Sequence, residues 1–128
     1  MKRSAVLASI VLVFALNGAA HAVTLRAGPL IHNVGGPFYD CAAVNVGTQI
    51  ISSLKIEIID ASTQTVSGSH ECLDVNPNGR CITGVSALAG SVVFCTITSS
   101  GRKKDVLGTL ELLDDAGLPI VTSEARQP

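Results

Sequence analysis

The sequence has few of the residues that catalytic, metal-handling and stacking proteins use. Its 128 residues include no tryptophan, one methionine, one tyrosine and three phenylalanines. Because the methionine is Met1, a methionine-rich copper site is excluded, and the aromatic side chains are too few for a platform that stacks sugars or single strands. H-E-x-x-H and G-x-S-x-G motifs are also missing. We expect a protein that is not an enzyme and holds no cofactor or metal, with a Ser-His-Asp site built from distant residues as the alternative.

No apolar run is long enough to cross a bilayer. The longest, Ala5 to Leu16, has 12 residues, whereas a transmembrane helix needs about 20. This run follows Lys2 and Arg3 and precedes the small-residue site Ala20-His21-Ala22, which is the order of a secretory signal. We predict that residues 1–22 are a cleaved signal peptide and that residues 23–128 form a single periplasmic or secreted domain, with no membrane insertion after cleavage.

Basic charge is scarce after the predicted cleavage site. Lys2 and Arg3 leave with the signal, so seven basic and ten acidic residues remain, a net charge of −3 with histidine neutral. Nucleic-acid-binding domains normally carry a net basic footprint. We therefore expect no nucleic acid as a partner, and propose another envelope or extracellular protein instead.

Four cysteines follow the signal, an even number that is typical of a disulfide framework in a short exported chain. They are Cys41, Cys72, Cys81 and Cys95, and three pairings are open to them. A zinc site is the alternative, but it usually requires two close pairs such as C-x-x-C, and the spacings here are 31, 9 and 14 residues.

Period-two alternation indicates β-strands. It is clearest at Leu54 to Ile58, where apolar residues alternate with Lys55 and Glu57, and it returns at Val106 to Leu112, where Gly108 suggests a bulge or a close approach. Turn signals recur at short intervals, and the segment Ile82 to Ala89 is ambiguous between a strand and a helical turn. This pattern predicts an all-β, two-sheet sandwich of seven to eight strands.

A shift of 54 positions superposes two stretches of the sequence. Cys41, Gly47, Glu57 and Asp60 fall on Cys95, Gly101, Glu111 and Asp114. We interpret the two stretches as equivalent β-hairpins, with a chance match as the alternative. If both cysteine strands face one core, Cys41 pairs with Cys95 between the sheets, and Cys72 pairs with Cys81 to close a short loop.

Four segments carry a family resemblance: Cys41 to Gly47, Ile56 to Asp60, Ser91 to Cys95 and Leu110 to Asp114. Together they resemble small uncharacterised secreted bacterial proteins with an immunoglobulin-like β-sandwich, and the likeness covers most of residues 38–121. The resemblance implies a fold and no activity. The chain lacks the tryptophan and the tyrosine corner of antibody domains, which disfavours a true antibody-type domain.

Two segments are candidate binding loops. Asp74 to Gly79 matches the start of a D-x-N-x-N-G calcium loop, but Val85 stands where the loop needs its bidentate glutamate, so a turn is the simpler interpretation. The loop from Cys72 to Cys81 presents Arg80 beside its closing cysteine, which suggests a protease inhibitor acting through this loop as the alternative function. Arg102, Lys103 and Lys104 stand at an expected hairpin tip. The candidate binding residues are therefore Asn78, Gly79, Arg80, Arg102, Lys103 and Lys104.

A possible catalytic pair of carboxylates, Glu57 and Glu111, is also visible in the sequence. Both glutamates lie on the polar side of an amphipathic strand, where such side chains normally meet water. We therefore expect the chain to be an exported, non-enzymatic binding or structural module.

Overall fold

The computed structural model describes residues 22–32 and 38–128 and shows a two-sheet β-sandwich. The predicted signal peptide falls outside the described residues except for Ala22. The strands are β1 (Val23–Ile31), β2 (Phe38–Asn45), β3 (Ile51–Asp60), β4 (Val66–Val75), β5 (Arg80–Ser86), β6 (Val92–Ser99), β7 (Val106–Leu113) and β8 (Pro119–Glu124). One short 3-10 helix, η1 (Lys103–Asp105), precedes β7. The described residues contain no helix that is long and apolar enough to cross a membrane.

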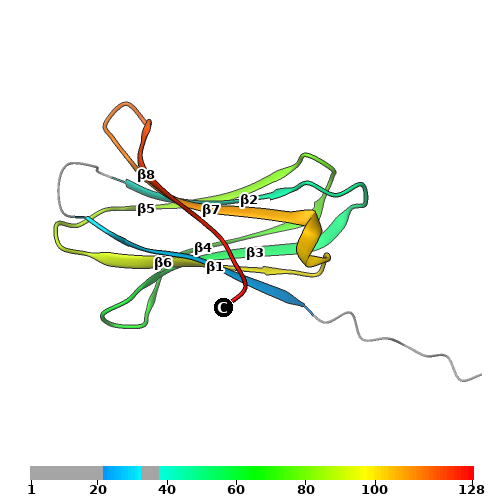
Figure 1. Ribbon diagram of the computed structural model, residues 1–128, viewed down its shortest axis with the longest axis horizontal. Coiled ribbons are helices and arrows are strands. Elements are labelled where there is room, and N and C mark those ends of the chain that lie inside the picture. Colours follow the sequence, from blue (N-terminus) through cyan, green and yellow to red (C-terminus); the bar gives the residue numbers. More distant parts are fainter. Residues whose placement is uncertain (1–21, 33–37) are drawn as a thin grey trace, which may run out of the picture.

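The predicted all-β class is confirmed, with four antiparallel strands in each of two sheets (Figure 1). The strand orders are β1-β6-β3-β4 and β5-β2-β7-β8. The expected alternation is present in β3, where Leu54, Ile56 and Ile58 are fully buried between the sheets and Lys55 and Glu57 face outward. The ambiguous segment after Cys81 forms strand β5.

Both predicted disulfides are present. Cys41–Cys95 joins β2 of one sheet to β6 of the other through the core, with 6.0 Å between the Cα atoms. Cys72–Cys81 joins β4 to β5, which are edge strands of different sheets. All four cysteines are therefore paired, and two disulfides suit an oxidising compartment.

The internal repeat extends to all eight strands. Adding 54 to the residue numbers of β2 reproduces the bounds of β6, and the same shift places β1, β3 and β4 over β5, β7 and β8 within a few residues. It also converts the strand order β1-β6-β3-β4 into β5-β2-β7-β8. The sandwich is thus pseudo-symmetric, and the Cys41–Cys95 disulfide joins equivalent positions of the two halves.

The predicted hairpins were wrong, although the repeat that suggested them is real. β2 and β3 lie in different sheets, as do β6 and β7, so each connection crosses the sandwich and neither strand pair is hydrogen-bonded. Alternation determines which face of a strand is buried, but it does not determine which other strand pairs with that strand. Both arrangements satisfy the same pattern, and only the long-range pairing separates them.

The two halves differ in how they fill the core. Ala43 and Gly108 are paired neighbours on β2 and β7, whereas the residues 54 positions away from them, Ile97 and Leu54, are bulky. A Cβ atom built on Gly108 would overlap Cδ1 of Ile97. The predicted close approach at Gly108 is therefore confirmed: the small residues of one sheet make room for the large residues of the other.

Candidate binding site at one end of the sandwich

The structure brings the two groups of predicted binding residues to the same end of the sandwich. We call residues 46–50, 76–80 and 100–105 the basic end. They comprise the connections from β2 to β3, from β4 to β5 and from β6 to β7, together with Arg80 at the start of β5, at the right of Figure 1. The first connection touches both others: the backbone N–H of Val46 donates to the Asp105 carbonyl, and that of Asn78 donates to the Asn45 carbonyl. Segments far apart in the sequence therefore form one surface.

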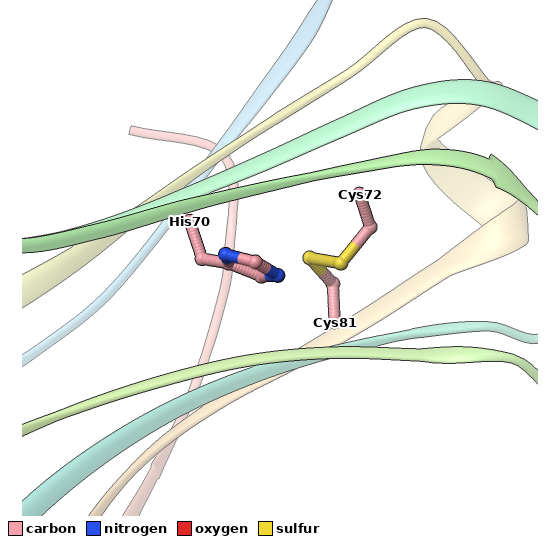
Figure 2. Close-up of side chains that lie close together, drawn as sticks. All are labelled: His70, Cys72 and Cys81. Carbon is pink, nitrogen blue, oxygen red and sulfur yellow. A yellow bond between two sulfur atoms is a disulfide. The ribbon is translucent and has the colours of Figure 1, made fainter.

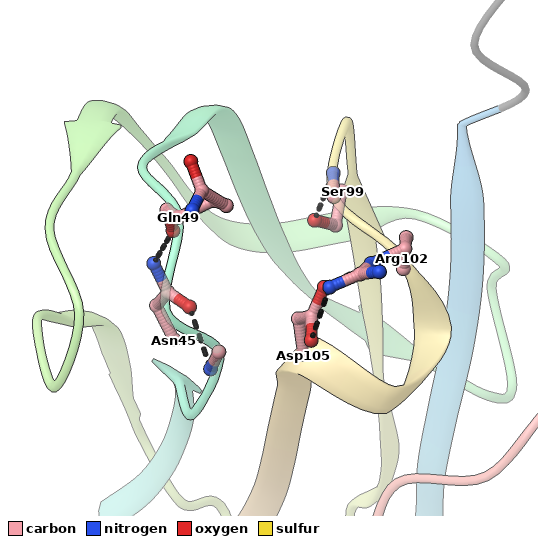
Figure 3. A network of polar contacts seen from close by, with 7 residues as sticks. Asn45, Gln49, Ser99, Arg102 and Asp105 are labelled. Carbon is pink, nitrogen blue, oxygen red and sulfur yellow. Dashed lines mark hydrogen bonds and ion pairs between the residues drawn. The ribbon is translucent and has the colours of Figure 1, made fainter.

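A buried asparagine ties these connections together. The Nδ2 atom of Asn45 donates to the carbonyl of Gln49 at 2.7 Å (Figure 3) and to that of Val75 at 2.8 Å, and its Oδ1 accepts from the Gly47 N–H at 3.0 Å. The side chain is fully buried. Three of its four hydrogen-bonding positions are therefore occupied, which holds the connection between β2 and β3 against the end of β4.

The equivalent residue in the second half is Ser99, which is also buried. Its Oγ accepts from the N–H of Gly101, as Asn45 accepts from Gly47 in the first half. Among the described residues, Asn45 and Ser99 are the two buried polar side chains, and they lie 54 positions apart. The repeat thus preserves a buried polar residue at the end of β2 and of β6, and each accepts a hydrogen bond from the N–H two residues later.

The cations of this end differ in how they are held. Nε of Arg102 donates to Oδ2 of Asp105 at 2.6 Å (Figure 3), and Nζ of Lys103 donates to the side-chain oxygen of Gln127 at 2.9 Å. Within the described part of the chain, Lys104 and Arg80 are exposed and form no salt bridge. Two of the four cations are therefore free to meet an anionic group without first breaking an ion pair or a side-chain hydrogen bond.

The site also exposes apolar side chains. Val46 and Ile50, both in the connection between β2 and β3, are 49% and 59% exposed, and Leu107 lies just beyond η1 at 50%. The backbone around them is fixed by hydrogen bonds to Asp105 and Gly79. Fixed loops that present apolar and basic groups together suit recognition of a partner, because little ordering is required on binding.

The opposite end of the sandwich is acidic. It carries Asp60 at the end of β3, and Asp114 and Asp115 in the connection from β7 to β8, at the left of Figure 1. Hydrogen bonds from the Ser62 hydroxyl, from the Thr63 N–H and from the Ser62 N–H hold the pKa of Asp60 below its usual value. The two ends of the sandwich thus carry net charges of opposite sign.

The Asp74 to Gly79 segment forms a turn. The N–H of Gly79 donates to the carbonyl of Asn76, with Pro77 second in the turn and Asn78 third at a φ of 63°. A left-handed third residue is the requirement of a type II turn, and proline is common at its second position. The segment therefore adopts the turn, which was the simpler interpretation of its sequence, in preference to a calcium loop.

Arg80, the residue that suggested an inhibitor, begins strand β5 rather than standing at the tip of a loop. It pairs with Val44 of β2, and the next residue, Cys81, is buried. A protease would have to detach this strand to reach the peptide bond after Arg80. Glu57 and Glu111, in turn, face outward from different sheets, so they do not form a catalytic pair.

One cluster was missed in the sequence. The side-chain ligand atoms of His70, Cys72 and Cys81 lie within 4.8 Å of one another (Figure 2). The signal was the spacing of two residues between His70 and Cys72, which turns both toward β5. Because the two sulfur atoms share a disulfide, the imidazole is the one strong metal ligand of the three.

Comparison of this chain with protein families, with curated proteins and with solved structures finds no match.

Proposed function

We propose that this protein is an exported, non-enzymatic binding module that docks its basic end onto an acidic surface of another envelope or extracellular protein. The observation that carries the proposal is the convergence of three connections on one end, which carries the cations Arg80, Arg102, Lys103 and Lys104 together with the exposed side chains of Val46 and Ile50. A chain with more acidic than basic residues thus presents a local excess of positive charge.

The rigidity of this end favours a folded protein as the partner. The buried Asn45 network, the turn before β5 and the Cys72–Cys81 disulfide fix the loops before binding. The three exposed apolar side chains of this site, Val46, Ile50 and Leu107, provide little area for insertion into a lipid layer, whereas they suit a small protein interface rimmed by charge. The sequence pattern of residues 1–22 supports export, and the two disulfides fit it.

The test compares two variants of equal net charge. Lys103→Gln with Lys104→Gln removes two positive charges from the basic end, and Ala116→Glu with Leu118→Glu adds two negative charges at the acidic end. Each variant is used to capture proteins from a periplasmic and secreted extract, and captured proteins are titrated at two salt concentrations. Electrostatic steering and rim contacts predict that the basic-end variant loses about tenfold in affinity for a protein that the acidic-end variant still binds.

Four results would contradict the proposal. Equal loss of binding in both variants would show that net charge alone matters. Salt-independent binding would remove the electrostatic argument, and preferential binding to vesicles of anionic phospholipid would replace the protein partner with a membrane surface. Trypsin inhibition by the intact chain, lost in Arg80→Ala, would favour the inhibitor instead.

A further inference from the structure

The two halves of the chain are interlocked rather than placed side by side. Strand pairs β1–β6, β2–β5, β2–β7 and β3–β6 all join the first half (β1 to β4) to the second half (β5 to β8). Within one half, the paired strands are β3–β4 and β7–β8. Neither half can therefore complete a sheet alone. Each half needs a complementary half, which can come from the same chain or from a second copy.

A single short connection joins the two halves. It consists of residues 76–79, between the end of β4 and the start of β5. Asp74 and Asn78 beside and within it adopt left-handed conformations, with φ of 51° and 63°, which non-glycine residues rarely take. If this connection straightened, both residues would return to extended backbone, and β4 and β5 would run on as one long segment.

The Cys72–Cys81 disulfide lies directly across this connection. It links residues nine positions apart on either side of the turn, with Cα atoms 5.9 Å apart. While it is closed, β5 stays beside β4 of its own chain. The other disulfide, Cys41–Cys95, joins the halves at a distance of 54 residues and would form equally well between halves of two different chains.

We propose that Cys72–Cys81 is a latch that keeps both halves of the sandwich within one chain, and that without it a second copy of this chain supplies the missing half. Two copies would open at residues 76–79 and exchange their second halves. The product contains two sandwiches with the same strand pairs as the monomer, so every hydrogen bond of the two sheets is retained. Its Cys41–Cys95 disulfides join different chains and make the dimer covalent.

The test matches two variants that each lose one disulfide. Cys72→Ser with Cys81→Ser removes the latch, whereas Cys41→Ser with Cys95→Ser removes the core disulfide and keeps the latch. Both variants and the unchanged chain are refolded under oxidising conditions at rising concentration. Their masses are measured by light scattering and on non-reducing gels.

Halves held in one chain meet at an effective concentration of about a millimolar, so exchange becomes measurable as the protein approaches that concentration. We expect the latch variant to form a covalent dimer joined by Cys41–Cys95, at about ten times the dimer fraction of the core-disulfide variant. The unchanged chain and the core-disulfide variant form only this small fraction of dimer and stay mainly monomeric.

Two outcomes would overturn the proposal: a latch variant that stays monomeric, with Cys41 joined to Cys95 of the same chain, or equal dimerisation of both variants. Cys81 is buried, so serine there can impair folding. The pair Cys72→Ala with Cys81→Val provides the same test with apolar side chains, and circular dichroism checks that each variant is folded.

Discussion

Replacement of Asn45 by alanine tests whether the polar network at the basic end stabilises the fold. The substitution removes two donated hydrogen bonds, to the carbonyls of Gln49 and Val75, and one bond accepted from the N–H of Gly47. Gln49 is exposed, so water can replace its bond. Val75 is buried and Gly47 is half-buried, so their groups lose a partner that water replaces poorly.

The expected loss of stability follows from these environments. A buried carbonyl left without a partner costs about 1–3 kcal/mol, a half-buried N–H costs less, and the small cavity left by the amide adds about 1 kcal/mol. We expect Asn45→Ala to lower the free energy of unfolding by about 3–4 kcal/mol, which is a large part of the roughly 5–15 kcal/mol of such a domain. Ser99→Ala, the equivalent site with one hydrogen bond, should lose only about 1 kcal/mol.

Urea unfolding followed by far-ultraviolet circular dichroism measures both values. A loss for Asn45→Ala that does not exceed the loss for Ser99→Ala would refute the reasoning. It would mean that the three hydrogen bonds of Asn45 stabilise the fold no more than the single hydrogen bond of Ser99 does.

The isosteric change Asn45→Asp tests whether Nδ2 of Asn45 stabilises the fold as a hydrogen-bond donor. Its second carboxylate oxygen would face the carbonyls of Gln49 and Val75, which raises the pKa of the new carboxyl in the folded state above its unfolded value. Its cost should therefore be smallest below the unfolded pKa and grow as the pH rises through the folded pKa. A cost that instead falls toward neutral pH would contradict the donor role of Nδ2.

Further predictions concern the core and one exposed turn. Gly108→Ala should destabilise the fold by about 1–3 kcal/mol because its new methyl group meets buried Ile97, whereas the control Gly84→Ala meets the movable side chain of Asp40 and should cost less; equal melting temperatures of the two variants would contradict this. Asp60→Asn should destabilise the protein at neutral pH and not in strong acid, because the folded pKa of Asp60 is lowered and its contribution disappears as the pH falls through that value. Urea titrations at both pH values measure the difference. If Asp60→Asn lowers the free energy of unfolding equally at both pH values, the ionised carboxylate of Asp60 does not stabilise the fold.

Local side-chain direction made much of this fold predictable. Alternation at Leu54 to Ile58 determined a strand with one buried face, the turn at Asn76 to Gly79 followed from its proline and asparagine, and the spacing of 54 between Cys41 and Cys95 marked the repeat. The pairing of the cysteines was predicted as well, from the repeat and the condition that the strands of Cys41 and Cys95 face one core. These features depend on residues close in sequence or on the rule that apolar faces meet.

Strand partners were decided only by the tertiary structure. The same alternating pattern fits a hairpin and a crossing between sheets, since the difference lies in contacts between residues dozens of positions apart. For the same reason, the sequence alone did not show that Arg80 and Lys104 share one end of the molecule, that Gly108 makes room for Ile97, or that His70 lies beside a disulfide. The sequence determined the faces of the strands and their covalent links, and the packing of two interlocked halves determined what those faces and loops are next to.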